Sequence, residues 1–306
     1  MIKKLLSIFN RYFLFFKDVY FDTFYYFRYS TLRARKKNNE NLSARILAHV
    51  HSIERAFSLK NTRKVFGKDL VNNLKQLIAD IDCKDRYEFE TRVYKSAING
   101  HNMHHGLLED FYHTNWAPIK RYKHLFFNRK SSYIEVVKSR RSIRNFSKKR
   151  VMETSLLQAI ALAKDTSPSV CNRQAWKVFI LKNRKIIEQV LEIQNGNSGI
   201  ENIQNIIIVC STITSFFDSS ERNQPYIDGG IFLMSLLNSL HYKNIASCPL
   251  NWSVNKSKDF ALKRILNIDN SIIIVSLIAI GGYGKDQVNV ASSYRKPLKK
   301  ILNIIH

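Results

Sequence analysis

Residues 140–146 read R-R-S-I-R-N-F, and they are the part of the chain that says most about its fold. Three guanidinium groups and a hydroxyl stand within five residues, a set that can neutralise and hydrogen-bond a phosphate dianion. The segment follows S-Y-I-E at residues 132–135, a capping-box pattern that predicts a short helix ending near Ser139. Taken alone, such a basic run also fits an ordinary solvated surface.

A second polar segment, T-S-P-S-V-C-N-R-Q-A-W, occupies residues 166–176. Pro168 keeps it out of a helix, and in an extended chain residues two apart face the same way. We therefore expect Asn172 and Gln174 to present two amides to one ligand edge, since an amide both donates and accepts hydrogen bonds. A loop that satisfies its own backbone is the alternative.

Two more segments and a pattern of helices and strands complete the second half of the chain. The segments are I-A-S-C-P-L-N-W at residues 245–252 and S-Y-R-K-P-L at residues 293–298. Apolar periodicity predicts helices near residues 152–164, 228–242 and 259–266, and β-branched runs predict strands at residues 177–181, 206–210 and 271–280. Mixed elements of this kind indicate an α/β or α+β fold.

In this order, the four segments resemble the FMN-dependent nitroreductase family, over about residues 131–306. The resemblance implies an α+β, three-layer fold with a central, mostly antiparallel sheet flanked by helices. It also implies a homodimer with FMN at the interface. The chain departs from the family's usual pattern at Ala175, where proline is usual. The stretch from Cys210 to Asp228 is also short, which leaves the substrate class open.

The resemblance assigns a set of cofactor-binding residues: Arg140, Arg141, Ser142, Arg144, Pro168, Ser169, Asn172, Gln174, Cys248, Pro249, Leu250 and Arg295. It implies that Arg140, Ser142 and Arg295 hold the FMN phosphate. Arg144 is the expected catalytic residue, because it would reach the polar edge of the flavin and stabilise negative charge on the reduced ring. Pro168, Ser169 and Asn172 would line the ring from the other subunit, and backbone N–H groups at 248–250 would approach flavin N5.

The activity implied by the resemblance is that of an FMN-dependent oxidoreductase. NADH or NADPH would deliver hydride in a ping-pong reaction to a small electron acceptor of the nitro, quinone or enone type. An alternative keeps the fold and the flavin but not the turnover: a flavin-binding, membrane-associated interaction subunit.

Composition and charge exclude several classes of protein and of binding partner. The 306 residues are 45% hydrophobic and 24% charged, an ordinary globular mixture that excludes collagen-like and low-complexity chains. The net charge of +25 is spread along the chain, because residues 1–130 carry 25 Lys/Arg against 12 Asp/Glu (+13) and the remainder carries 24 against 12 (+12). No nucleic-acid-binding motif accompanies the charge, so we expect no nucleic-acid partner. Four widely spaced cysteines indicate a reduced, cytoplasmic protein rather than a disulfide scaffold.

Residues 1–130 are expected to form a separate, aromatic-rich helical region, with helices over residues 42–50 and 70–78 and a domain boundary near residue 130. Aromatic residues crowd positions 9–29, but charges recur too often for a transmembrane helix. Two hypotheses remain. The segment is an aromatic helix packed on the chain or on a partner subunit, or an interfacial helix that brings residues 1–37 to a membrane surface.

The histidine and glycine clusters elsewhere in the chain are expected to be structural rather than to form catalytic, metal or phosphate sites. His51 and Glu54 are three residues apart and are expected to pair on one helical face. Four histidines at 101, 104, 105 and 113 have no carboxylate or cysteine set to complete a metal site, so we expect no metal. G-G-Y-G at residues 281–284 lacks the spacing of a phosphate loop and predicts a turn.

Overall fold

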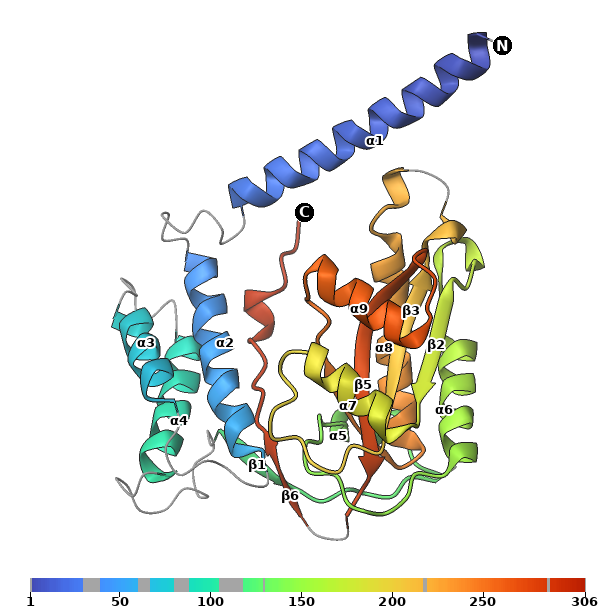
Figure 1. The fold of residues 1–306 in the computed structure, drawn as a ribbon. Coiled ribbons are helices and arrows are strands. Elements are labelled where there is room, and N and C mark those ends of the chain that lie inside the picture. The colour runs from blue at the N-terminus through green and yellow to red at the C-terminus, as the bar shows by residue number, and fades with distance from the viewer. Residues whose placement is uncertain are drawn as a thin grey trace. The chain divides into compact units, whose positions relative to one another are not determined.

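The computed structural model describes residues 2–29, 39–59, 67–79, 88–104, 118–128, 130–216, 219–284 and 287–305 (Figure 1). The chain forms two compact units. Unit 1 combines Met1–Ser30 with His124–Lys285, and unit 2 combines Thr31–Lys123 with Asp286–His306. Cys83 and the basic run at residues 33–37 lie outside the described residues.

The centre of unit 1 is a four-stranded sheet in the order β2-β3-β5-β4, with every neighbouring pair antiparallel. Its strands are β2 (Trp176–Leu181), β3 (Asn205–Thr212), β4 (Ile245–Leu250) and β5 (Ile272–Gly282). Residues 206–210 of β3 are fully buried, because helices cover both faces of the sheet, and this explains the unbroken Ile and Val run. The strands predicted at residues 177–181, 206–210 and 271–280 are confirmed.

Helices form the outer layers of unit 1. They are α5 (Tyr133–Ser139), α6 (Glu153–Thr166), α7 (Arg184–Ile193), α8 (Gln224–Tyr242) and α9 (Lys256–Leu266), with short 3₁₀ turns η3 (Val170–Asn172), η4 (Ile213–Ser215) and η5 (Ser219–Glu221). Leu156 of α6 and Phe232 and Leu236 of α8 pack on one face of the sheet, whereas α7 and α9 lie on the other side (Figure 1). The expected three-layer α+β fold is confirmed, as is the capping box between Ser132 and Glu135.

The glycine pair at the end of β5 serves close packing rather than the expected turn. Gly281 and Gly282 are the last two residues of the strand. A Cβ on Gly281 would lie 2.7 Å from the Cβ of Phe146, so only glycine lets the coil after α5 approach the strand. Ser147 N–H then donates to the Gly282 carbonyl at 3.0 Å. The turn prediction for this stretch is wrong, because the strand continues through both glycines.

Unit 2 contains the helices α2 (Asn39–Phe57), α3 (Lys68–Ala79) and α4 (Glu88–His104), the 3₁₀ turn η6 (Leu298–Lys300), and a two-stranded antiparallel sheet of β1 (Ile119–Tyr122) and β6 (Val288–Ala291). Its core includes Ile46, Ile53, Leu74 and Val93. Both predicted helices are confirmed. The pairing of His51 with Glu54 is also confirmed, at 3.3 Å between Nδ1 and Oε2.

The compact units do not follow a single cut at residue 130. Within unit 2, β1 from the first half of the chain pairs with β6 from the last twenty residues, from Ile119 opposite Ala291 to Tyr122 opposite Val288. Within unit 1, the first helix, α1 (Ile2–Tyr29), contacts η5. None of the helices among the described residues combines the length and apolar character that a membrane span requires.

Candidate active site

The R-R-S-I-R-N-F segment runs from the end of α5 along the outer strand of the sheet. The Ile143 N–H donates to the Ser247 carbonyl of β4 at 2.9 Å. Ile143 and Phe146 are buried and fix the segment against the body of unit 1. The structure therefore brings the segment that carries Arg140 and Ser142, two of the residues expected to hold the phosphate, next to β4, which carries Cys248, Pro249 and Leu250.

The cationic residues of this segment differ in their surroundings. Arg140, Arg141 and Ser142 are half-buried, whereas the side chain of Arg144 is 7% exposed. Arg141 Nη1 donates to the carbonyls of Lys138 and Arg140, both at 2.8 Å, and so satisfies the carboxyl end of α5. Arg141 thus has a structural role at the end of α5 in addition to the FMN-binding role expected of it.

A buried cluster that contains His241 and His124 packs against the end of α5, where the R-R-S-I-R-N-F segment begins. His241, in the last turn of α8, is fully buried between two hydroxyl groups. Its Nε2 lies 3.0 Å from Ser139 Oγ and its Nδ1 lies 2.9 Å from Tyr283 Oη. The ring of His124 stacks on Tyr283 with centroids 3.6 Å apart. These contacts hold the end of α5, and with it Arg140, against α8 and β5.

Burial, together with the nearby charges of His124, Arg140 and Arg141, lowers the pKa of His241 to about 3. The imidazole is therefore neutral in the folded protein at pH 7. Arg140 and Arg141 place positive charge at the end of α5, where the phosphate is expected to bind. Sequence patterns missed this cluster, because its residues lie far apart in the chain and match no motif.

The cluster predicts an acid-sensitive stability. Below the ordinary histidine pKa of about 6.5, the unfolded chain binds a proton that folded His241 does not, so stability falls as pH falls. Lowering the pH from 7 to 5 should cost about 2 kcal/mol at this residue. Urea unfolding at both pH values should show a smaller pH effect in His241→Gln than in the wild type.

The matched control is His49→Gln, which changes a half-buried histidine in α2. This variant should keep the full wild-type loss of stability between pH 7 and pH 5. An unchanged pH effect in His241→Gln would contradict the assignment.

The second expected segment forms a tight loop after α6 rather than an extended chain. Cys171, Asn172 and Gln174 have φ values of 46°, 53° and 50°, in the left-handed region. The prediction of an extended segment is therefore wrong, because Val170–Asn172 turns as η3 and reverses the chain. Gln174 N–H donates to Ser169 Oγ at 3.0 Å, and Gln174 Nε2 lies 3.4 Å from the Asn172 carbonyl. Pro168, Asn172 and Gln174 are exposed.

A buried carboxylate holds this loop in place. Asp228, near the start of α8, is 1% exposed. It accepts the Val170 N–H at 3.2 Å and the Gln224 side-chain amide at 2.8 Å. Its own carbonyl accepts the Trp176 indole N–H at 3.1 Å. Left-handed non-glycine residues persist where surrounding bonds over-determine them, and such positions cluster at functional sites.

The two expected segments lie at opposite ends of α8 within one copy of the chain. The loop at 168–174 is bound by Asp228 at the amino end, whereas the R-R-S-I-R-N-F segment meets His241 at the carboxyl end. From residue 228 to residue 241 are 13 residues, which span about 20 Å in a helix. Figure 1 shows α5 at one end of α8 and the turns before α8 at the other.

On β4, Cys248 is buried opposite Ala279 of β5, and Pro249 has no N–H group. Because the Ser247 carbonyl faces Ile143, the alternation along a strand turns the backbone groups of Cys248 and Leu250 toward β5. This arrangement does not favour the expected approach of N–H groups at 248–250 to flavin N5, and that role stays a prediction. Asn251, directly after the strand, is exposed beside this edge, and sequence patterns did not single it out.

The remaining candidates belong to other parts of the chain. Arg295 belongs to unit 2, where its Nη1 donates to the Ser293 carbonyl at 2.5 Å, and its role stays a prediction.

His105, His113 and the side chain of His104 lie outside the described residues. In the part of the chain that the structure describes, no three His, Cys, Asp or Glu side chains could hold a metal ion. Cys248 is buried, whereas Cys171 is exposed.

Comparisons of the sequence with known proteins find similarity to one family. Residues 137–205 match the model of the Nitroreductase family. A relative from Methanothermobacter thermautotrophicus, provisionally named an NADH dehydrogenase/NAD(P)H nitroreductase, is 24% identical over 155 residues, or 50% of this chain and 78% of the relative. A relative of the same name from Archaeoglobus fulgidus is 23% identical over 158 residues, or 50% of this chain and 86% of the relative.

A solved structure shares the fold. It is provisionally described as an NAD(P)H:FMN oxidoreductase from Staphylococcus epidermidis and has a TM-score of 0.51 at 17% identity. The match covers 60% of this chain and 100% of the other.

Proposed function

We propose that this nitroreductase-family domain binds FMN between two copies of the chain and passes hydride from NADH or NADPH to a small electron acceptor. The names of its relatives, which pair NAD(P)H with nitroreductase activity, support the reaction class. The observation that carries the proposal is the separation of the two ligand-type segments along α8, because each segment alone offers only half of a flavin site.

The residues present fit an FMN molecule. Arg140 and Ser142 supply a charged donor and a hydroxyl for a phosphate, and both are half-buried at the end of α5. Arg144, with its guanidinium almost fully buried, can hold a positive charge against the polar edge of the ring. The exposed loop with Pro168, Asn172 and Gln174 offers amides and an apolar ring to a second molecule.

The residues that anchor the two segments of one copy, Asp228 and His241, lie about 20 Å apart along α8, a separation that favours a flavin site shared with a second copy. A second copy of the chain that presents its 168–174 loop to the R-R-S-I-R-N-F segment of the first would complete the site. By symmetry the same contact would form twice, as in an isologous dimer.

Bound FMN supplies the atom that accepts and releases hydride, which no protein side chain can do. The chain's own residues bind and orient it. Arg140, with Arg141 and Ser142, fixes the phosphate, and Arg144 stabilises negative charge at the ring edge. Donor and acceptor would occupy one face in turn, which is a ping-pong scheme, and solvent supplies the proton because no general acid is evident among these residues.

We further propose a cytoplasmic location, since the buried Cys210 and Cys248 are unpaired thiols. The alternative is a flavin-binding, membrane-associated subunit without rapid turnover. Its membrane association is motivated by the exposed aromatic residues of α1.

The test uses purified full-length protein, NADPH and the water-soluble quinone menadione. The flavin absorption band should disappear with NADPH and return when the quinone is added. Bound flavin that never bleaches would support the non-catalytic alternative. A protein that takes up no FMN and elutes as a monomer would contradict the proposal as a whole.

A further inference from the structure

The first helix of the chain is attached to unit 1 through its two acidic residues. Asp22 receives two parallel hydrogen bonds from Arg222, from Nε at 2.6 Å and from Nη2 at 2.7 Å. Asp18 accepts the hydroxyl of Ser219 at 2.8 Å. The Arg222 bond holds the pKa of Asp22 below its usual range, so the carboxylate stays charged. These contacts use both acids of the described part of α1.

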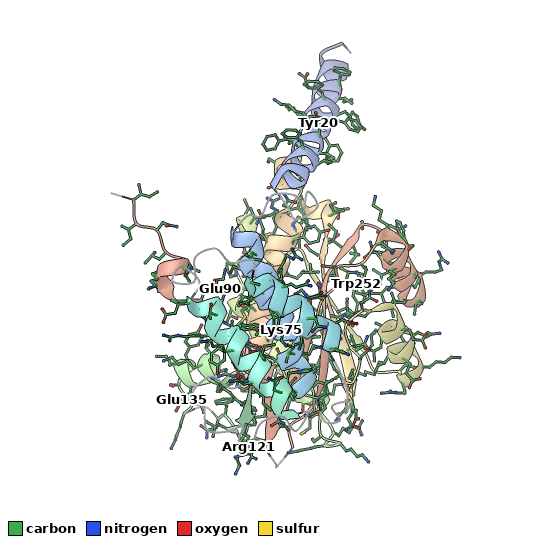
Figure 2. All side chains as sticks on the ribbon, turned by 90° about the vertical axis from the view of Figure 1, so that its left-hand side faces the viewer. Tyr20, Lys75, Glu90, Arg121, Glu135 and Trp252 are labelled. Atoms are coloured by element: carbon green, nitrogen blue, oxygen red, sulfur yellow. The ribbon has the colours of Figure 1, made fainter. Side chains whose placement is uncertain are left out.

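The opposite side of α1 is a strip of exposed aromatic rings. The strip, called the aromatic face below, consists of Phe9, Tyr12, Phe13, Phe16, Tyr20 and Phe24, at spacings of three and four residues. Asp18 is two residues from both Phe16 and Tyr20, which is a rotation of about 200° on a helix. The aromatic face therefore points away from the attachment. Phe16 is 67% exposed and Tyr20 is 73% exposed, and Figure 2 shows Tyr20 on this helix.

The charges that remain on α1 are positive. Arg11 and Lys17 are exposed, whereas the carboxylates of Asp18 and Asp22 are engaged by Ser219 and Arg222. Lys17, next to Phe16, flanks the aromatic face, whereas Arg11 is seven residues from Asp18 and lies on the attached side of the helix. A helix with exposed Phe and Tyr, a flanking cation and no free acid matches an anionic lipid surface, where aromatic rings enter the headgroup region and a cation at their edge meets phosphates. A helix-to-helix contact with a second copy would favour aliphatic residues in a heptad pattern instead.

The attachment point of α1 is continuous with the loop proposed to line the flavin. Glu221, next to Arg222, pairs with Arg173, whose Nη1 lies 2.9 Å from Oε2. The same Nη1 donates to the Ser215 carbonyl at 2.8 Å. Arg173 stands between Asn172 and Gln174. Two successive ion pairs, Asp22–Arg222 and Glu221–Arg173, therefore connect the aromatic helix to the proposed flavin loop.

We propose that the aromatic face of α1 binds an anionic membrane surface and that the electron acceptor is a quinone dissolved in that lipid. The substrate assignment rests on the proposed function, whereas the membrane contact does not. The overall reaction is balanced: NAD(P)H, one proton and a quinone give NAD(P)⁺ and a quinol. One hydrogen and two electrons come from the nicotinamide as hydride, and the second hydrogen is a proton from water.

The first experiment measures membrane binding by flotation of the full-length protein with vesicles of equal parts phosphatidylcholine and phosphatidylglycerol. The test variant is Phe16→Ser with Tyr20→Ser, and binding should fall by about tenfold or more. Tyr133→Ser with Phe260→Ser is the matched control. It removes one Phe and one Tyr that are 48% and 76% exposed on α9 and α5. The control should bind as the wild type does, and added salt should weaken binding.

The second experiment compares two acceptors in these proteins. With a long-chain quinone in the same vesicles, Phe16→Ser with Tyr20→Ser should oxidise NADPH about tenfold more slowly than the wild type and the control. With menadione in solution, all three proteins should react at the same rate. This combination separates lipid access from loss of the flavin site.

Other outcomes overturn the inference in distinguishable ways. Equal flotation of the test variant and the wild type would show that the aromatic face is not the membrane contact. A wild-type protein that stays off the vesicles but loses an oligomeric form in the test variant would assign the face to a second copy. Membrane binding without NADPH oxidation by either quinone would overturn the acceptor assignment together with the proposed function, while the contact itself would stand.

Discussion

The Arg140→Ala, Ser142→Ala double variant should lose its FMN during gel filtration, whereas the wild type keeps it. The substitutions remove one charge-assisted hydrogen bond, worth about 1.5–3 kcal/mol, and one neutral hydrogen bond, worth about 0.5–1.5 kcal/mol. The sum, about 2–4.5 kcal/mol, corresponds to a weakening of affinity by roughly 30-fold to 2,000-fold. Absorbance of the eluted protein, and titration of the apoprotein with FMN, would measure it.

Arg150→Ala is the matched control. Arg150 lies in the same coil and is exposed, and no cofactor role is assigned to it. It should retain the flavin as the wild type does. Full retention in the double variant would show that the phosphate binds elsewhere.

The second large effect is expected for Asp228→Ala. The substitution removes the acceptor of the Val170 N–H and of the Gln224 amide in a place that is 1% exposed. Leaving buried donors unsatisfied costs about 1–3 kcal/mol for each group, so the unfolding free energy should fall by about 3 kcal/mol. The loop at 168–174 would also lose its anchor, and flavin content should fall with it.

Asp228→Asn separates the lost hydrogen bond from the lost charge. The amide keeps an oxygen acceptor of the same size at the same place, so this variant should lose about 1 kcal/mol and keep most of its flavin. Urea unfolding and flavin absorbance on the same samples would compare the two substitutions. Equal stability of Asp228→Ala and wild type would show that the loop does not depend on this carboxylate.

Local patterns predicted the elements of unit 1 that carry strong signals. The capping box at Ser132 and Glu135, the apolar periodicity of α6 and α8 and the Ile-rich β3 and β5 all appear where they were expected. Such signals act within a few residues, so they survive in a single sequence. The fold itself followed from four short motifs in order, not from any one element.

The elements that were not predicted depend on distant partners. β4, with Ser and Pro in its middle, has weak strand propensity, but β5 pairs with it along its whole length. Cys171 adopts a left-handed conformation because Asp228, far along the chain, holds Val170. Spacing in the sequence contains neither relationship, so the extended form expected of residues 166–176 was wrong.

In the candidate site, too, local features could be predicted and features that depend on distant residues could not. The residue types that suit a phosphate and a heterocycle could be read from the chain, because their chemistry belongs to the side chains. Their arrangement could not, since it depends on α8 holding one segment at Asp228 and the other at His241. The histidine that supports the phosphate segment was missed for this reason.

The pairing of β1 with β6 limits how the chain can be divided. A fragment that begins at residue 131 would keep Val288–Ala291 but lose Ile119–Tyr122, the only strand that the described structure pairs with it. An open strand edge bearing valines at 288 and 290 attracts other chains and promotes aggregation. Shortened forms intended for expression or crystallisation would therefore do better to retain both strands or to remove both.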